Sequence, residues 1–186
     1  TQENVIRNKL EIDEGDPFNE LLNAKSLNNI KSLNIFKSVK SEVVDGDAIK
    51  TKVINIEVEE KPTGEISLGA GVGSEGGTIG FAVSENNFMG RGVKLSSSLR
   101  ATDTTVRGGL SINNPNFNYS KKALITTLES TVIDKLSDNG YETTKTGFSL
   151  GTKFEQYENT YISPTLSTYV EDLTTNSKAS SNLKKQ

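Results

Sequence analysis

The sequence predicts an α+β segment over residues 1–60, a linker over 61–63 and an all-β antiparallel segment over 64–186. Apolar residues recur at spacings of three and four before Leu33, which is the helical period, and alternate with polar residues from Phe36 onward. No helical period returns after Pro62. The 186 residues include no Cys and no His, which excludes thiol nucleophiles, disulfides, thiolate metal sites and the usual general base.

Two helices are expected in the first segment. Thr1 can cap the first helix, and Glu3 stands in its first turn, where the helix dipole favours an acid. Pro17 suits the start of the second helix, since proline is tolerated in the first turn. The apolar side of the first helix is Val5, Ile6 and Leu10, and that of the second is Phe18, Leu21, Leu22, Leu27, Ile30 and Leu33.

A strand hairpin is expected to complete the first segment. One strand carries Phe36, Val39 and Val43, and the other runs from Ile49 to Val58. Asp45-Gly46-Asp47 lies between them, and Asp-Gly between two alternating runs is a hairpin signal. The order helix, helix, strand, strand in so few residues provides little core for an independent domain.

Seven strand-like runs follow in residues 64–173, and the last of them covers residues 160–173. Such alternation fits a soluble sandwich, whose apolar face is a core, or a membrane barrel, whose apolar face meets lipid. Gly, Ser and Thr dominate the polar side, and most runs are near the length that a tilted strand needs to cross a bilayer. We therefore favour transmembrane barrel strands.

Other functions find little support in the residues. A net charge of -3 with dispersed Lys argues against a nucleic-acid surface. Gly71–Gly76 matches the G-x-G-x-x-G pattern, but an alternating strand follows where a nucleotide site requires a helix. The acidic stretches at 13–16 and 45–47 lack calcium-loop spacing. We expect no enzymatic activity, no metal and no cofactor.

Four stretches are specific enough to indicate a family: Leu33–Val39, Glu59–Gly64 together with Ser67–Gly77, Glu85–Gly92, and Asn114–Phe117. They resemble the BamA family of outer-membrane β-barrel assembly proteins, in the bacterial surface antigen (POTRA–barrel) superfamily. The resemblance implies that residues 1–60 are most of the last POTRA repeat, without its opening strand. It implies that residues 64–186 are the N-terminal part of a barrel, about seven of sixteen strands. We also expect the chain to be a piece of a longer, processed protein.

The same resemblance implies a function. The family folds and inserts outer-membrane proteins by templating their strands at a lateral seam, here the strand Ser67, Leu68, Gly69, Ala70, Gly71, Val72 and Gly73. Arg7 and Glu14 match positions through which the family docks accessory outer-membrane lipoproteins. The implied partners are those lipoproteins, unfolded outer-membrane protein substrates and the lipid bilayer, with no nucleic acid. The implied location is the outer membrane, with the POTRA part periplasmic.

Two alternatives remain open. A two-partner secretion or translocation-module transporter of the same superfamily also joins POTRA repeats to a barrel, although the Glu85–Gly92 stretch favours the assembly proteins. A soluble β-sandwich adhesin with a small α/β module is a third possibility, from a different class.

Overall fold

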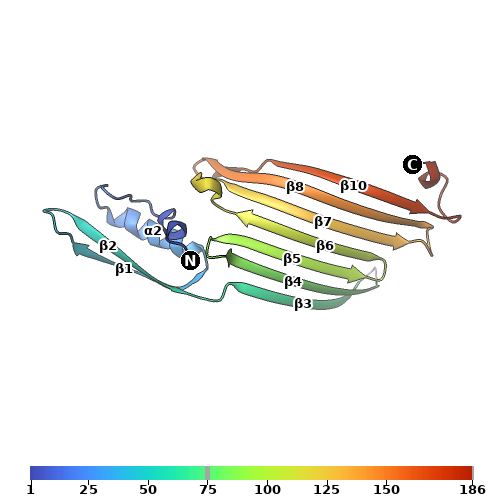
Figure 1. Ribbon diagram of the computed structural model, residues 1–186, viewed down its shortest axis with the longest axis horizontal. Helices are drawn as coiled ribbons and strands as arrows, with labels where there is room; N and C mark the ends of the chain where they lie inside the picture. Colours follow the sequence, from blue (N-terminus) through green and yellow to red (C-terminus); the bar gives the residue numbers. More distant parts are fainter. Residues whose placement is uncertain (74–75, 186) are drawn as a thin grey trace. The chain divides into compact units, whose positions relative to one another are not determined.

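The computed structural model describes residues 1–73 and 76–185 (Figure 1). Its contacts divide the chain into two compact units. The first comprises Thr1–Thr63 with Asn86–Val93, and the second comprises Gly64–Glu85 with Lys94–Gln186. None of the described helices is both long enough and apolar enough to cross a membrane.

The first unit packs one long helix against a two-stranded sheet. Its elements are α1 (Glu3–Arg7), α2 (Glu20–Ser32), β1 (Phe36–Asp45) and β2 (Lys52–Glu60). Ile30 of α2, Ile35 just before β1, and Phe36 at the start of β1 are buried and form the centre of the core. Partly buried apolar residues surround them: Val5, Ile6, Leu10, Leu33, Val39, Ile56 and Val58. The expected order helix, helix, strand, strand is therefore present.

Both helices begin later than the sequence predicts. The N-cap of α1 is Gln2, and no side chain caps that helix; the Thr1 hydroxyl instead accepts a hydrogen bond from Asn87 Nδ2 (2.9 Å). The N-cap of α2 is Asn19, whose Oδ1 accepts hydrogen bonds from the backbone N–H groups of Leu21 (2.9 Å) and Leu22 (3.2 Å). Pro17 precedes the helix because Asn19, unlike proline, supplies a side-chain acceptor for the unpaired N–H groups of the first turn.

The predicted hairpin is confirmed, with a longer connection. β1 and β2 pair antiparallel from Asp45↔Lys52 to Phe36↔Glu60. The loop between them is closed by a hydrogen bond from Gly46 N to Thr51 O (2.9 Å). Ile49, expected on the second strand, lies in this loop and is 92% exposed.

The turn after β4 belongs to the first unit because it packs on α1. Gln2 N donates to Gly90 O (2.7 Å), and Asn87 Oδ1 accepts from Gly92 N (2.8 Å). Gly90 and Gly92 both have positive φ, and a Cβ on Gly92 would lie 3.0 Å from a methyl carbon of Val5. Glycine is thus favoured at Gly92 by both its backbone conformation and its close approach to α1.

The second unit is a meandering sheet in which neighbours in sequence are neighbours in space. The strand order is β10-β8-β7-β6-β5-β4-β3, and each registered pair is antiparallel. The strands are β3 (Gly64–Gly73), β4 (Gly76–Phe88), β5 (Val93–Thr102), β6 (Thr105–Asn114), β7 (Ala123–Lys135), β8 (Tyr141–Tyr157), β9 (Thr160–Ile162) and β10 (Thr165–Thr175). Short 3-10 helices, η1 (Phe117–Tyr119) and η2 (Leu183–Lys185), lie outside the sheet. The expected predominance of antiparallel strands is confirmed; over the described residues, the sheet is open rather than closed.

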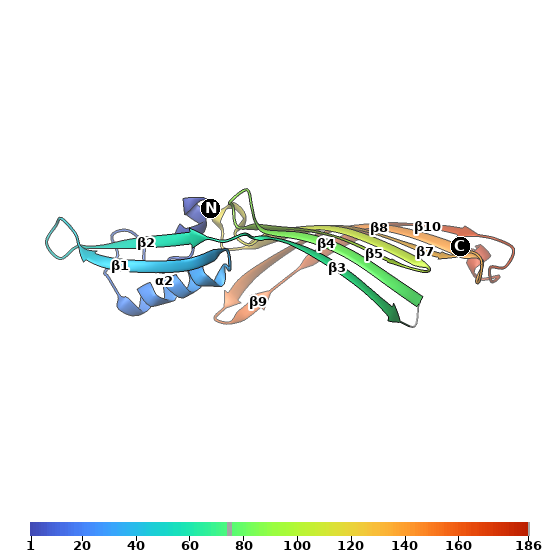
Figure 2. The same cartoon turned by 90° about the horizontal axis from the view of Figure 1, so that it is seen from below.

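The last predicted strand is interrupted. Residues 160–173 were expected to form one strand, but Ser163-Pro164 separates β9 from β10. Proline has no N–H to donate, and Pro164 contributes only its carbonyl, which accepts from Thr152 N (3.0 Å). β9 pairs with the C-terminal end of β8, and this hairpin curves out of the plane of the sheet (Figure 2).

Candidate functional site: an apolar sheet face and an edge strand

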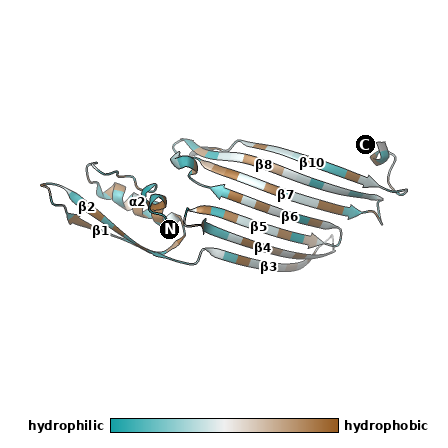
Figure 3. Ribbon diagram, in the orientation of Figure 1, coloured by the Kyte–Doolittle hydropathy of each residue, from teal (hydrophilic) through white to brown (hydrophobic). Residues whose placement is uncertain are grey.

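Strand register places most of the apolar side chains of β5, β6, β7, β8 and β10 on one face. Leu110 is opposite Leu128 on β7, and Leu128 is opposite Phe148 on β8. Two residues along the strands, Ile112, Thr126, Leu150 and Leu166 form the next row on the same side. We define the apolar face as these rows and the alternate residues in line with them: Leu95, Leu99, Val106, Leu110, Ile112, Leu124, Leu128, Val132, Phe148, Leu150, Leu166 and Val170. Figure 3 shows the corresponding alternation of brown and teal along the strands.

The opposite face, here called the polar face, carries hydroxyl and charged groups. One row across five strands consists of Ser96, Ser111, Thr127, Ser149 and Ser167. The hydroxyls of Ser111 and Thr127 are within hydrogen-bond distance (3.4 Å). The two faces of this single sheet therefore differ in their predominant chemistry.

The apolar face is open to its surroundings. Leu128 in the middle of the sheet is 49% exposed, and Leu166 on β10 is 77% exposed. Apolar surface left in water costs about 25 cal/mol per Å² relative to burial. Within the described part of the second unit, no second sheet covers this face. An apolar environment such as lipid would supply what a sandwich partner supplies in a soluble fold.

All seven predicted seam residues lie on one edge strand. Ser67–Gly73 belong to β3, which pairs with β4 from Gly64↔Glu85 to Gly73↔Gly76. β3 ends the strand order, so its outer edge has no partner strand among residues 1–73 and 76–185, and all ten of its residues are exposed. A Cβ added at Gly69, Gly71 or Gly73 would meet no atom within 4 Å. Ser74 and Glu75 of the G-x-G-x-x-G stretch lie outside the described residues.

Arg7 and Glu14, the predicted partner-binding residues, are brought together by a direct ion pair. Arg7 Nη1 donates to Glu14 Oε1 (2.8 Å), and Arg7 Nε donates to Glu3 Oε1 (2.6 Å). The hydrogen bonds from Glu14 and then Glu3 raise the pKa of the Arg7 guanidinium above its ordinary value. All three side chains are exposed. The sequence placed Glu3 in the first helical turn, but its ion pair with Arg7 was not predicted, although a spacing of four is an ion-pair signal in helices.

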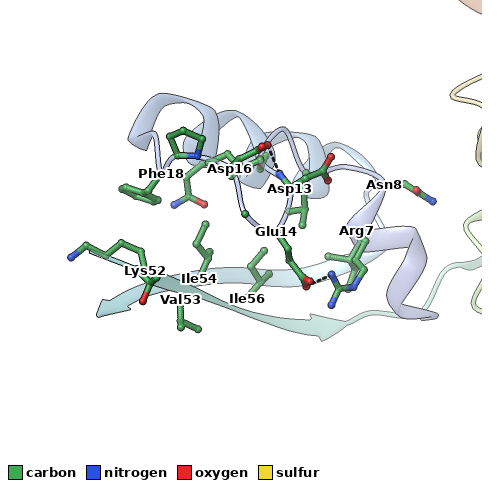
Figure 4. A pocket seen from close by; sticks show the side chains of 18 of the residues that line it. Arg7, Asn8, Asp13, Glu14, Asp16, Phe18, Lys52, Val53, Ile54 and Ile56 are labelled. Carbon is green, nitrogen blue, oxygen red and sulfur yellow. Dashed lines mark hydrogen bonds and ion pairs between the residues drawn. The ribbon is translucent and has the colours of Figure 1, made fainter. Parts of the chain in front are cut away.

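The ion pair borders a cleft of about 920 Å³ in the first unit. Ile54 and Ile56 of β2 point into this cleft, whereas Val53 points away from it, and Phe18 lies toward the opposite end from Arg7 (Figure 4). The cleft thus combines an apolar floor with a charged rim.

The sequence of the chain is similar to the sequences of two BamA proteins. No family model matches the chain. It is 29% identical over 119 residues to the outer membrane protein assembly factor BamA of Neisseria meningitidis serogroup B, and 32% identical over 103 residues to BamA of Neorickettsia risticii. The resemblance to the BamA family is confirmed. These alignments cover 63% and 54% of this chain but only 15% and 14% of the two BamA proteins.

A solved BamA structure shares the fold. The crystal structure of BamA from Haemophilus ducreyi lacking POTRA domains 1–3 matches with a TM-score of 0.82 and 19% sequence identity. The match covers 93% of this chain and 34% of that BamA chain. Both units therefore have counterparts in a BamA structure.

Proposed function

We propose that the chain is part of an outer-membrane protein assembly factor whose sheet lies in the outer membrane with its apolar face against lipid. The relatives are named as assembly factors of this kind, which supports the class of function. The one-sided apolar face supports the placement, since a barrel strand alternates lipid-facing and lumen-facing residues.

The proposed mechanism is strand templating by the β3 edge, without enzymatic chemistry. The observation that carries it is that β3 ends the described sheet with all ten residues exposed. In water a backbone hydrogen bond contributes only about 0.5–1.5 kcal/mol net. In lipid an unpaired backbone group costs several kcal/mol, so an open edge there strongly favours pairing with an incoming strand. The proposed substrates are unfolded outer-membrane proteins.

Photo-crosslinking tests this mechanism. A photo-reactive residue at Ser67 or Leu68 of β3 is expected to capture outer-membrane proteins during their folding in cells. The same group at Leu150, in the interior strand β8, is the control and is expected to capture few. Capture from Leu150 alone would contradict the role of β3.

The first unit is proposed to lie in the periplasm and to bind accessory lipoproteins through Arg7 and Glu14. Because these residues pair with each other, single and double charge reversals separate a structural role from a binding role. Arg7→Glu is expected to abolish co-purification of the lipoproteins. Combining Arg7→Glu with Glu14→Arg restores the internal ion pair but presents reversed charges to a partner, so co-purification is expected to stay lost. Recovery in the double variant would assign the pair to stability alone.

A further inference from the structure

Two arginines face each other on the polar face. Arg100 of β5 is directly opposite Arg107 of β6 in the antiparallel register. The row continues through Thr131 of β7 and Lys145 of β8 and reaches an acid only at Glu171 of β10. We call Arg100, Arg107, Thr131, Lys145 and Glu171 the basic row. Directly opposed residues have Cβ atoms roughly 4.5–5.5 Å apart, and like charges at that separation are destabilising.

Neither arginine forms an ion pair with a carboxylate in the described part of the chain. Arg107 Nε donates to Thr131 Oγ1 (3.2 Å), which anchors the side chain and keeps its terminal nitrogens as donors. The charge of Lys145 has a different partner: its Nζ lies 3.7 Å from the centre of the Tyr169 ring, in a cation–π contact. Arg7, by contrast, is neutralised by two carboxylates. The Arg100–Arg107 pair is thus an uncompensated double positive charge.

The surroundings leave room beside this pair. The next row of the polar face contains Gly109, which has no side chain, and the nearest side-chain atom to a Cβ built there would be Ser98 Oγ at 3.7 Å. Two acids flank this part of the polar face: Glu129 lies in the same row as Gly109, and Glu171 lies at the end of the basic row. Because both would repel an anion, an anion is expected to stay next to the two arginines. Asp103 of the β5–β6 turn lies beside Gly76 and Gly77 of β4.

We propose that Arg100 and Arg107 bind a phosphate monoester on the polar face. Such a group carries about −1.5 to −2 charge at pH 7, which matches two guanidinium groups, whereas a carboxylate would neutralise only one. Each guanidinium presents a planar fork of N–H donors suited to bidentate contact with phosphate oxygens. The site does not depend on the proposed function, because the polar face carries these groups whatever covers the apolar face.

Calorimetric titration of the full chain in a zwitterionic detergent tests the site. One arm adds inorganic phosphate, and the other uses micelles containing phosphatidic acid; both are compared with sodium chloride at equal ionic strength. Arg100→Gln and Arg107→Gln are each expected to weaken binding roughly tenfold. Arg107→Lys keeps the charge but loses the fork and is expected to weaken binding severalfold. Lys94→Gln, on the same face in another row, is the matched control and is expected to change nothing.

The arms also identify the source of the phosphate. Binding in both arms indicates a phosphate group that is accessible from solution, and binding only to phosphatidic acid indicates a lipid headgroup; either result supports the site. Circular dichroism confirms that each variant keeps its strands. Absence of binding in both arms, or equal affinity in the wild type and in both Gln variants, would overturn the proposal. So would a loss in Lys94→Gln as large as that in Arg100→Gln, because binding would then reflect overall charge.

Discussion

Asn19 sets the start of α2, because its Oδ1 accepts hydrogen bonds from two backbone N–H groups of the first turn. Replacing such a cap by alanine costs about 1 kcal/mol. Asn19→Ala is therefore expected to lower the protection of the α2 amides against hydrogen exchange by roughly fivefold. Gln2→Ala is the control, since the Gln2 side chain caps nothing in α1. Equal protection in the wild type and Asn19→Ala would refute this role.

Asp45 and Lys52 close the β1–β2 hairpin by an ion pair of 2.5 Å. The hydrogen bond from Lys52 lowers the pKa of Asp45 below its ordinary value of 3.8. A lowered pKa in the folded state means that the stabilisation is present above pH 3.8 and is lost as the pH falls through the folded-state pKa. An NMR titration of Asp45 is expected to show a midpoint below 3.8, and Lys52→Gln is expected to return it toward that value. An unchanged midpoint in Lys52→Gln would count against the pairing.

The residue scale is also where sequence reasoning was least accurate. Thr1, Pro17 and Asn19 are all residue types found near helix starts. Which residue actually begins each helix depends on backbone geometry that the sequence does not contain. Arg7 and Glu14 were selected from a resemblance, and their direct ion pair required the folded loop between them.

At the scale of elements, period-two alternation located the strands well. Alternation determines which residues share a face, and a register slip of one residue would reverse the faces. It does not show where a strand is interrupted, so Pro164 split a predicted strand and Ile49 proved to lie in a loop. The edge position of β3 also depends on the order of the whole sheet, which alternation alone does not give.

Glycine substitutions distinguish the edge strand from the loops. A Cβ at Gly71 of β3 meets open space, and glycine in a strand costs roughly 0.5–1 kcal/mol, so Gly71→Ala is expected to stabilise the β3–β4 pairing slightly. Gly140 has φ +77, and a Cβ there would lie 2.3 Å from Ala179 N. Gly140→Ala is expected to destabilise the second unit by more than about 1 kcal/mol in denaturant unfolding. Equal effects of the two substitutions would contradict this account of β3.

At the scale of the whole molecule, the described sheet exposes one apolar face and two strand edges. Large exposed apolar patches and open edges promote association in water. The isolated chain is therefore expected to aggregate in plain buffer and to remain dispersed in detergent, as measured by light scattering. A soluble monomer with a sharp cooperative melt would favour the β-sandwich alternative.

The sequence alone predicts a sheet with one apolar and one polar face, but it does not predict what covers the apolar face. Alternation of Leu128 with Thr127 is the same whether the apolar face meets lipid or a second sheet. The choice came from specific stretches such as Glu85–Gly92. The comparisons confirm the resemblance of the chain to the BamA family. Outer-membrane placement and strand templating remain proposals.

Two neighbouring residues of β7 provide a direct test of whether the apolar face of the sheet lies against lipid. Leu128 is on the apolar face, and Thr127, one residue earlier, is on the polar face. Each is replaced by cysteine, labelled with a fluorophore in the full chain and reconstituted with brominated lipids. If the apolar face lies against lipid, quenching is expected to be strong at position 128 and weak at 127. Equal quenching at both positions, or stronger quenching at 127, would contradict it.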